Sequence, residues 1–297
     1  RSKLLKKGLV SITSISQIRR FIGKEKIDVL LLYNLPQAPL LHLAECRTHF
    51  DLADDLVAMM QVELGVIAKA GAMLAAGAVQ SHMIRQAGTV TVASSVLEEQ
   101  INRDVLMLPN GADVAELDQV DGSVWRSQNQ GPTVGFVGAF EYWVNFELIL
   151  ETAQRLPRVN FLLVGGGRRW QGVKHKVEKL GLTNVHLTGA MPYQQAMNHV
   201  AGMDVCLLPF TKDAVSDGSC PLKLFEYAAL RKPIVSTKTH EVARIGQGWM
   251  SFADDAASFA DAIEFFLADN RAAAHAGEAG RAMEIGRASC RERVSSP

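Results

Sequence analysis

Apolar and polar positions alternate regularly along the second half of the chain. Five short apolar runs predict buried strands, at residues 133–138, 160–164, 185–188, 204–209 and 233–237. Amphipathic helices are predicted between them, at residues 146–155 and 194–201. Continuous apolar strands separated by such helices are typical of a parallel sheet that helices cover on both faces. This half is therefore predicted to be a doubly wound α/β domain.

The first half of the chain shows the same alternation with fewer strands. Its predicted elements are strands at 27–33, 89–94 and 104–108, a helix at 16–24 and helix-rich chain at 53–87. These strands are too few for a whole domain. A polar stretch at residues 118–131 predicts a hinge. For a chain of 297 residues we therefore predict two domains, at 1–120 and 132–283, joined by a hinge at 121–131.

Composition and charge exclude several classes of protein. The hydrophobic content of 48% supplies packed cores, so the chain is not expected to be disordered. Lys+Arg and Asp+Glu are both 31, and this balance gives no support to a nucleic-acid partner. The four cysteines contain no Cys-x-x-Cys pair, and His49, His186 and His240 have no spacing typical of metal or triad chemistry. We expect no metal and no cofactor.

Both ends of the sequence predict a fragment. The chain begins Arg1-Ser2-Lys3, with no initiator Met and no signal-peptide pattern, and no apolar run reaches transmembrane length. Residues 284–297 begin Glu-Ile-Gly-Arg-Ala-Ser-Cys-Arg-Glu-Arg-Val, which resembles the translation of a common sequencing-library adapter. We therefore expect residues 284–297 to be an assembly artefact, with a short natural helix as the alternative.

The stretch at residues 221–237 combines a helix start with a cation and a carboxylate. Pro221 suits the first position of a helix, where its missing N–H has no cost. Lys223 and Glu226 lie three residues apart, so both project near one side of the first turns. Because a helix N-terminus attracts anions, the group suits a ligand with phosphates and hydroxyls, such as a nucleotide sugar. The alternative is an ordinary amphipathic helix with a solvated Lys/Glu pair.

Several short motifs follow one another in a fixed order. They are residues 50–55, 92–97, 109–113, 135–139, 184–189 and 204–210, followed by the 221–237 stretch. The ordered set resembles bacterial glycosyltransferases of the GT-B architecture, of the retaining family 4 type that builds cell-surface polysaccharides. The resemblance covers residues 15–270 and implies two Rossmann-like doubly wound domains, the first incomplete. Complete members begin upstream of Arg1, so we expect exposed apolar surface on the first domain.

The resemblance implies a donor site in the second domain. Its residues would be Gly138, Gly218, Ser219, Pro221, Lys223 and Glu226. Glu226 matches the carboxylate that binds the donor ribose, while Lys223 and the backbone around 218–220 would face the diphosphate. Gly138 matches a glycine that lets the backbone approach the ligand closely. Arg231 replaces the glycine that usually ends the ribose-binding helix, and a left-handed cap there would cost about 1 kcal/mol more than glycine.

The resemblance also implies catalytic or acceptor-binding roles for Asp51, Asp54 and Asp55. They match an acidic loop of the first domain, which faces the acceptor in such enzymes. Carboxylates there could hydrogen-bond sugar hydroxyls or help deprotonate the attacking one. Alternatively, Asp51 or Asp54 simply caps the helix that follows.

The chain departs from the family pattern at several positions. Gly218 stands where many relatives carry a second Glu, and Glu141 lies in a segment where they carry cations. A carboxylate close to a diphosphate would repel it. Arg168 and Arg169 are our hypothesis for the missing positive charge. The preceding glycine run, 165–167, lacks the last glycine of a dinucleotide fingerprint and predicts only a turn.

We therefore predict a cytoplasmic glycosyltransferase of the hexosyltransferase type. It would move a sugar from a nucleotide-diphosphate donor to a polysaccharide or lipid-linked acceptor with retention of configuration. Peripheral contact with the inner face of the membrane, through the Met/Leu/Ala stripe at 58–79, stays open as an alternative. Two other functions also stay open: a nucleotide-sugar 2-epimerase and a catalytically silent nucleotide-sugar-binding scaffold.

Overall fold

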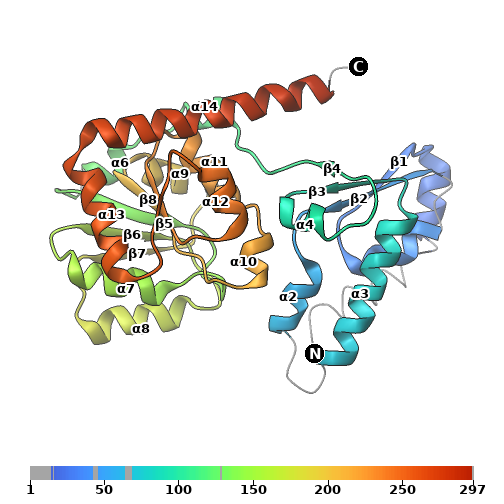
Figure 1. Cartoon of the computed structure of the whole chain (residues 1–297), viewed down its shortest axis with the longest axis horizontal. Coiled ribbons are helices and arrows are strands. Elements are labelled where there is room, and N and C mark those ends of the chain that lie inside the picture. Colours follow the sequence, from blue (N-terminus) through green and yellow to red (C-terminus); the bar gives the residue numbers. More distant parts are fainter. Residues whose placement is uncertain (1–14, 16, 43–45, 64–68, 128, 296–297) are drawn as a thin grey trace. The chain divides into compact units, whose positions relative to one another are not determined.

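The chain folds into two compact units (Figure 1). The computed structural model describes residues 15, 17–42, 46–63, 69–127 and 129–295. The first unit comprises Arg1–Pro109 with Asp217–Cys220, and the second comprises Asn110–Ser216 with Pro221–Pro297. Each unit contains one sheet in which all paired strands are parallel. The predicted α/β fold class is confirmed.

The first unit holds a four-stranded sheet with its core on one face. Its strands are β1 (Val29–Leu32), β2 (Arg47–Leu52), β3 (Thr89–Val92) and β4 (Leu106–Met107), in that order across the sheet. Its helices include the 3-10 helix η1 (Leu35–His42), α2 (Leu56–Glu63), α3 (Lys69–Gln86) and α4 (Ser95–Glu99), and residues 17–25 are also helical. Leu32, Phe50 and Met83 are fully buried in this core.

Strand β2 corrects the prediction of an acidic loop at residues 50–55. Phe50 and Leu52 of this strand point into the core, while His49 and Asp51 alternate with them. Strands were predicted from continuous apolar runs. Strand β2 has no such run, because buried and less buried side chains alternate along it. Residues 64–68 of the Met/Leu/Ala stripe lie outside the described residues, while Ala76 of α3 packs into the core.

The opposite face of this sheet carries exposed apolar side chains. Val29, Leu31, Tyr33, Leu106 and Leu108 are 41–61% exposed, and Leu31 shares its row of the sheet with His49 and Thr89. Parallel sheets are usually covered on both faces. Apolar surface is therefore exposed on this face of the described sheet.

The second unit holds a six-stranded sheet with a reversal of strand order. Its strands are β5 (Thr133–Val137), β6 (Asn160–Val164), β7 (Val185–Gly189), β8 (Val205–Leu208), β9 (Ile234–Ser236) and β10 (Ser251–Phe252). They lie in the order β10-β9-β8-β5-β6-β7, so the chain proceeds outward from β5 in one direction and from β8 in the other. In open parallel sheets, ligands bind beyond the carboxyl ends of the strands at such a reversal.

The helices of the second unit lie before, between and after its strands. They are α5 (Val114–Leu117), α6 (Ser123–Arg126), α7 (Phe146–Arg155), α8 (Trp170–Leu180), α9 (Tyr193–Ala201), α10 (Ala214–Gly218, whose last two residues belong to the first unit), α11 (Leu222–Ala229), α12 (His240–Gly246), α13 (Ala256–Ala268) and α14 (Asn270–Ser295). The five strands predicted for this half are all present, within two residues at each end. The two-residue strand β10 was too short to be predicted.

The segment predicted as a hinge lies in the second unit. The change from one unit to the other falls between Pro109 and Asn110. Helix α6 buries Trp125, whose indole N–H donates a hydrogen bond to Thr133 Oγ1 at 3.1 Å. The predicted hinge segment has a polar sequence because Trp125 is the buried side chain of this short helix.

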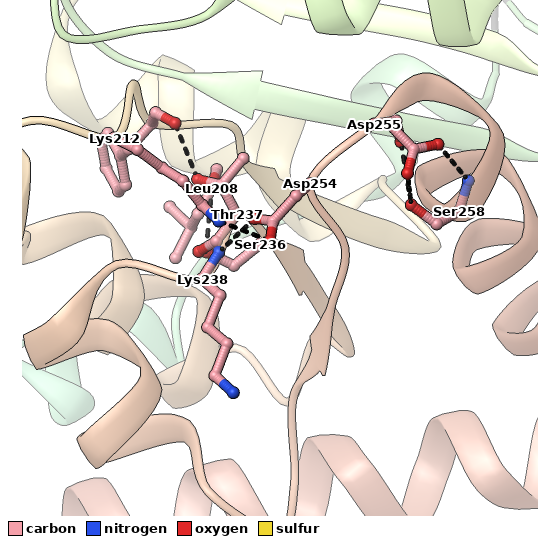
Figure 2. Close-up of polar contacts among 9 residues, drawn as sticks. Leu208, Lys212, Ser236, Thr237, Lys238, Asp254, Asp255 and Ser258 are labelled. Atoms are coloured by element: carbon pink, nitrogen blue, oxygen red, sulfur yellow. Dashed lines mark hydrogen bonds and ion pairs between the residues drawn. The ribbon is translucent and has the colours of Figure 1, made fainter.

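Hydroxyl groups secure the carboxyl ends of β8 and β9 (Figure 2). Ser236 Oγ donates to the Leu208 carbonyl at 3.0 Å, and Thr237 Oγ1 donates to the Phe210 carbonyl at 2.8 Å. Asp254, beyond β10, accepts from Lys212 Nζ at 2.5 Å. These bonds hold together the chain at the carboxyl ends of β8, β9 and β10. Helix α11, which follows β8, lines the cavity of this unit.

Helix α14 packs against the end of α11. Arg231 has φ 54°, the left-handed conformation for which a glycine would have been expected, and its Nε pairs with Glu278 at 3.0 Å. Arg281 donates to the Ala229 carbonyl. Glu284 is buried and its Oε1 accepts from the Ala112 N–H at 2.6 Å. The assignment of residues 284–297 to an adapter stays a prediction, and residues 296–297 lie outside the described part.

Candidate functional site

A cavity of about 380 Å³ opens beyond the carboxyl ends of β5, β6 and β7 in the second unit. It is lined by Val137, Gly138, Ala139, Val164, Gly165, Gly166, Ala190, Met191, Tyr193, Ala196, Met197, Leu222, Lys223 and Glu226. Of the residues predicted for the donor site, Gly138, Lys223 and Glu226 therefore come together in one cavity. Pro221 precedes α11 as its N-cap residue.

Gly138 provides the space that Lys223 occupies. It has φ 149°, and a Cβ added there would lie 1.9 Å from Lys223 Cε and 2.7 Å from Nζ. Burial lowers the pKa of Lys223, while the nearby Glu226 carboxylate raises it. The Lys223 ammonium lies 6.0 Å from the centroid of the Phe136 ring. A cation that lines a cavity in this way can bind an anionic ligand.

Glu226 is a buried carboxylate beside this lysine. Glu226 is only 4% exposed, and it lines the cavity together with Tyr193 of α9. Burial raises the pKa of Glu226, while Lys223 and Tyr193 lower it. An ionised carboxylate accepts hydrogen bonds at both oxygens, so it can bind hydroxyl groups of a ligand.

The glycine run 165–167 contributes to the cavity, although the sequence predicted only a turn. Gly165 has φ 131°, and a Cβ there would lie 2.0 Å from the Gly138 carbonyl oxygen. The Gly138 N–H donates to the Val164 carbonyl at 2.9 Å, so the turns after β5 and β6 pack backbone against backbone. The run of glycines was the available signal. Glycine is required at position 165 because β6 pairs with β5, which brings the two turns into contact.

The two arginines after this glycine run do not line the cavity. Arg168 Nε pairs with Glu141 at 3.0 Å, and Arg169 Nη2 contacts both oxygens of Glu147 at 2.8 and 3.1 Å. The hypothesis that they supply positive charge to this cavity therefore finds no support. Arg168 instead offsets the negative charge of Glu141, which had been expected to repel a diphosphate.

Tyr227 joins α11 to β5 at the reversal of the sheet. Its ring is fully buried, and its hydroxyl oxygen accepts from the Val137 N–H at 2.9 Å. Strands β5 and β8 pair at Val134 and Gly135, so Val137 lies past the last paired residue of β5. The tyrosine hydroxyl thus replaces a strand partner where the two strands separate and the cavity begins.

We expect Tyr227→Phe to lower the free energy of unfolding of the second unit by about 1–3 kcal/mol, because it leaves a buried N–H without a partner. All four tryptophans lie in this unit, so their fluorescence during urea denaturation follows it selectively. Glu178→Gln, in the second unit at a side chain that is 62% exposed, is the control and should change stability by less than about 0.5 kcal/mol. Equal stabilities of the Tyr227→Phe variant and the wild type would contradict this role.

The three aspartates of the first unit have different surroundings. Asp51 Oδ1 accepts from Thr91 Oγ1 at 2.6 Å. Asp55 caps α2, because its Oδ1 accepts from the N–H groups of Val57 and Ala58 at 3.1 and 2.8 Å. The cap is thus Asp55 rather than Asp51 or Asp54. Burial raises the pKa of Asp54, and the neighbouring carboxylates of Asp51 and Asp55 raise it further.

Gly218 and Ser219 belong to the first unit by their contacts. Gly218 ends α10, and its carbonyl accepts from Ser94 Oγ at 2.7 Å. Neither residue is among those that line the cavity of the second unit. Their role toward a diphosphate stays a prediction.

The described residues hold no group of three or more His, Cys, Asp or Glu side chains that could bind a metal ion. His49 instead contacts Thr89 Oγ1 and Thr91 Oγ1 through its two ring nitrogens, at 2.7 and 3.0 Å. Within the same part of the chain, no helix has both the length and the apolarity that crossing a membrane requires.

Comparison with known proteins adds a family match for the second unit. Residues 131–269 match the family described as glycosyl transferases group 1. The chain is 26% identical over 175 residues to the putative teichuronic acid biosynthesis glycosyltransferase TuaH of Bacillus subtilis (strain 168), covering 55% of this chain and 44% of the relative. It is 29% identical over 102 residues to the O-antigen chain mannosyltransferase C of Escherichia coli, covering 34% and 27%. The chain thus spans less than half the length of these curated relatives.

Solved structures support the GT-B architecture. The sucrose-phosphate synthase of Thermosynechococcus elongatus superposes with a TM-score of 0.74 at 14% identity, covering 94% of this chain and 77% of that chain. Anabaena Alr3699/HepE, in complex with UDP and glucose, superposes with a TM-score of 0.71 at 16% identity, covering 95% and 81%. At these identities the likeness concerns the fold.

Proposed function

From the match of residues 131–269 to the family described as glycosyl transferases group 1, we propose that the chain is part of an enzyme that transfers a sugar from a nucleotide-diphosphate donor. The acceptor is a polysaccharide or a lipid-linked saccharide. The teichuronic acid and O-antigen names of the two relatives support this class of acceptor. Uridine diphosphate is the first nucleotide to test, since it is bound in the Anabaena structure.

The observation that carries the proposal is that Lys223 and Glu226 line the same cavity, close to the reversal of strand order in the sheet. Glu226 accepts hydrogen bonds from the ribose hydroxyls, each contributing about 1.5–3 kcal/mol as a bond to a charged group. Lys223 and the free N–H groups at the start of α11 bind the diphosphate. The apolar side chains of Met191 and Met197 line the remaining wall.

The proposed reaction proceeds with retention of configuration. The acceptor hydroxyl attacks the anomeric carbon from the side of the donor phosphate as the bond to the diphosphate oxygen breaks. Lys223 stabilises the negative charge that develops on the leaving diphosphate. Asp54 of the first unit, whose pKa burial raises, is the proposed general base that takes the proton of the attacking hydroxyl.

Thermal unfolding with a panel of nucleoside diphosphates tests the donor site. A ligand at 100 times its dissociation constant should stabilise the second unit by about 2.7 kcal/mol. We expect one nucleotide to raise the unfolding temperature of the wild type and to lose this effect in Glu226→Gln. Glu178→Gln, on the exposed surface of α8, is the matched control and should respond as the wild type does. A folded wild type that responds to none of the nucleotides would exclude the proposed site.

A catalytically silent nucleotide-sugar-binding protein is the second candidate. Of the residues that line the described cavity, only Lys223 is basic, which leaves little positive charge for a leaving diphosphate. This alternative predicts donor binding without turnover. Release of nucleoside diphosphate from a bound nucleotide sugar, measured with and without saccharide acceptors, separates the two functions.

A further inference from the structure

Two histidines of the first unit meet between the 3-10 helix η1 and helix α3. His42 is the last residue of η1, and His82 lies four residues before the end of α3. Their Nε2 atoms are 2.8 Å apart, and their ring centroids lie 5.0 Å apart at an interplanar angle of 48°. The two residues are 40 positions apart in the chain, so no short metal-binding motif in the sequence indicates this pair.

Buried neighbours fix the backbone at both histidines. Leu40 of η1 is 6% exposed and Met83 of α3 is fully buried, and both belong to the core of this unit. His42 itself is exposed and His82 is half-buried. The packed core therefore holds the two residues in place, while solvent reaches their rings.

We propose that His42 and His82 form a binding site for a divalent transition-metal ion of the Ni²⁺ and Cu²⁺ class. Neutral imidazole is the commonest protein ligand for metal ions and suits both of these. In the contact between the two rings, the Nε2–H of one donates to the Nε2 of the other. When the ion binds, that proton moves to Nδ1 of its own ring, so both Nε2 lone pairs coordinate the ion.

The separation of the two nitrogens favours this class of ion. A bond from metal to histidine nitrogen is about 2.0–2.1 Å long, so two such bonds at a right angle place their nitrogens about 2.8–3.0 Å apart. The tetrahedral angle of Zn²⁺ requires about 3.3–3.4 Å. The observed 2.8 Å matches the right angle, which is typical of tetragonal Cu²⁺ and Ni²⁺ sites.

The bound ion links η1 to α3. Both elements pack on the core of the first unit, so an ion that needs the two rings together binds the folded unit and not the unfolded chain. Such a ligand stabilises the folded state by mass action. Water completes the coordination, because the described residues hold no group of three or more His, Cys, Asp or Glu side chains that could do so. The proposal does not depend on the donor site.

Calorimetric titration of the full chain with Ni²⁺ tests the site. Ni²⁺ is the probe because it does not oxidise free thiols such as that of Cys46. We expect one ion per chain at the strongest site, and at least about a tenfold loss of affinity in His42→Ala and in His82→Ala. The double variant should bind about as weakly as either single variant, because one ion needs both rings. His175→Ala removes an exposed histidine of α8 and is the matched control, with unchanged affinity.

Amide hydrogen exchange gives a second readout that does not depend on the measured affinity. Saturating Ni²⁺ should slow exchange in η1 and α3 of the wild type but not of His82→Ala. Losses of affinity that add up in the double variant would indicate two separate ions and overturn the shared site. The same holds if neither substitution changes Ni²⁺ binding, in variants whose circular dichroism matches that of the wild type.

Discussion

Gly138→Ala is expected to weaken nucleotide binding by about 100-fold while the second unit stays folded. The added Cβ occupies the place of Lys223 Cε, which is 1.9 Å away. The obstacle is the flexible end of a side chain, so Lys223 moves and removes its charge from the cavity. Loss of a charge-assisted contact to the diphosphate costs about 1.5–3 kcal/mol. Backbone strain at φ 149° separately lowers the free energy of unfolding by about 1–3 kcal/mol, a cost that does not enter the affinity.

A double variant isolates the displaced lysine. In the Lys223→Ala background, the atoms that the new Cβ meets are absent, so adding Gly138→Ala should reduce affinity much less than it does in the wild type. Titration calorimetry measures binding, and tryptophan fluorescence checks that each variant is folded. If Gly138→Ala weakens binding equally in both backgrounds, Lys223 is not the group through which the glycine acts.

Gly165→Ala is expected to destabilise the second unit by about 2–6 kcal/mol. Overpacking contributes about 1–3 kcal/mol, and a side chain at φ 131° contributes about 1–3 kcal/mol more. The obstacle here is backbone, since the new Cβ would lie 2.0 Å from the Gly138 carbonyl oxygen. No rotamer change relieves that contact, so the turns after β5 and β6 must move apart. Because whole domains are stable by only about 5–15 kcal/mol, such a loss brings the unit close to unfolding.

Urea denaturation followed by tryptophan fluorescence measures the effect on this unit alone. Gly172→Ala is the matched control, because Gly172 lies within α8 and a Cβ there would meet no atom within 4 Å. It should stabilise the unit by about 0.5–1 kcal/mol, as replacement of a helical glycine usually does. Similar transitions for Gly165→Ala and the wild type would show that the two turns are not held in contact.

The sequence predicted the parts of the site that depend on local geometry. Pro221 marked the start of a helix, and the spacing of Lys223 and Glu226 placed both near one side of it. The apolar runs predicted all the longer strands of the second unit, because strands buried on both faces are continuously apolar. Strand β2 was not predicted, because the polar residues His49 and Asp51 on its less buried face interrupt the run of apolar residues.

The cap at Asp55 shows a limit of a different kind. Each of the three aspartates suited the start of a helix by residue type alone. The choice depends on which one has its carboxylate within reach of the free N–H groups of α2, and that is decided by where β2 ends. A shift of one residue in the end of that strand would have assigned the cap to a neighbour.

What the sequence determined by itself was the set of elements and the chemistry that a single helix presents, since helical spacing and burial patterns are local properties of the chain. The tertiary structure decided which distant residues complete the site. Tyr193 and Glu226 line one cavity from different helices, Tyr227 bonds to Val137 where β5 and β8 separate, and Gly165 packs on Gly138 because β6 pairs with β5. These contacts depend on the order of strands in the sheet. That order follows from the packing of the whole domain and leaves no mark in the spacing of residues along the chain.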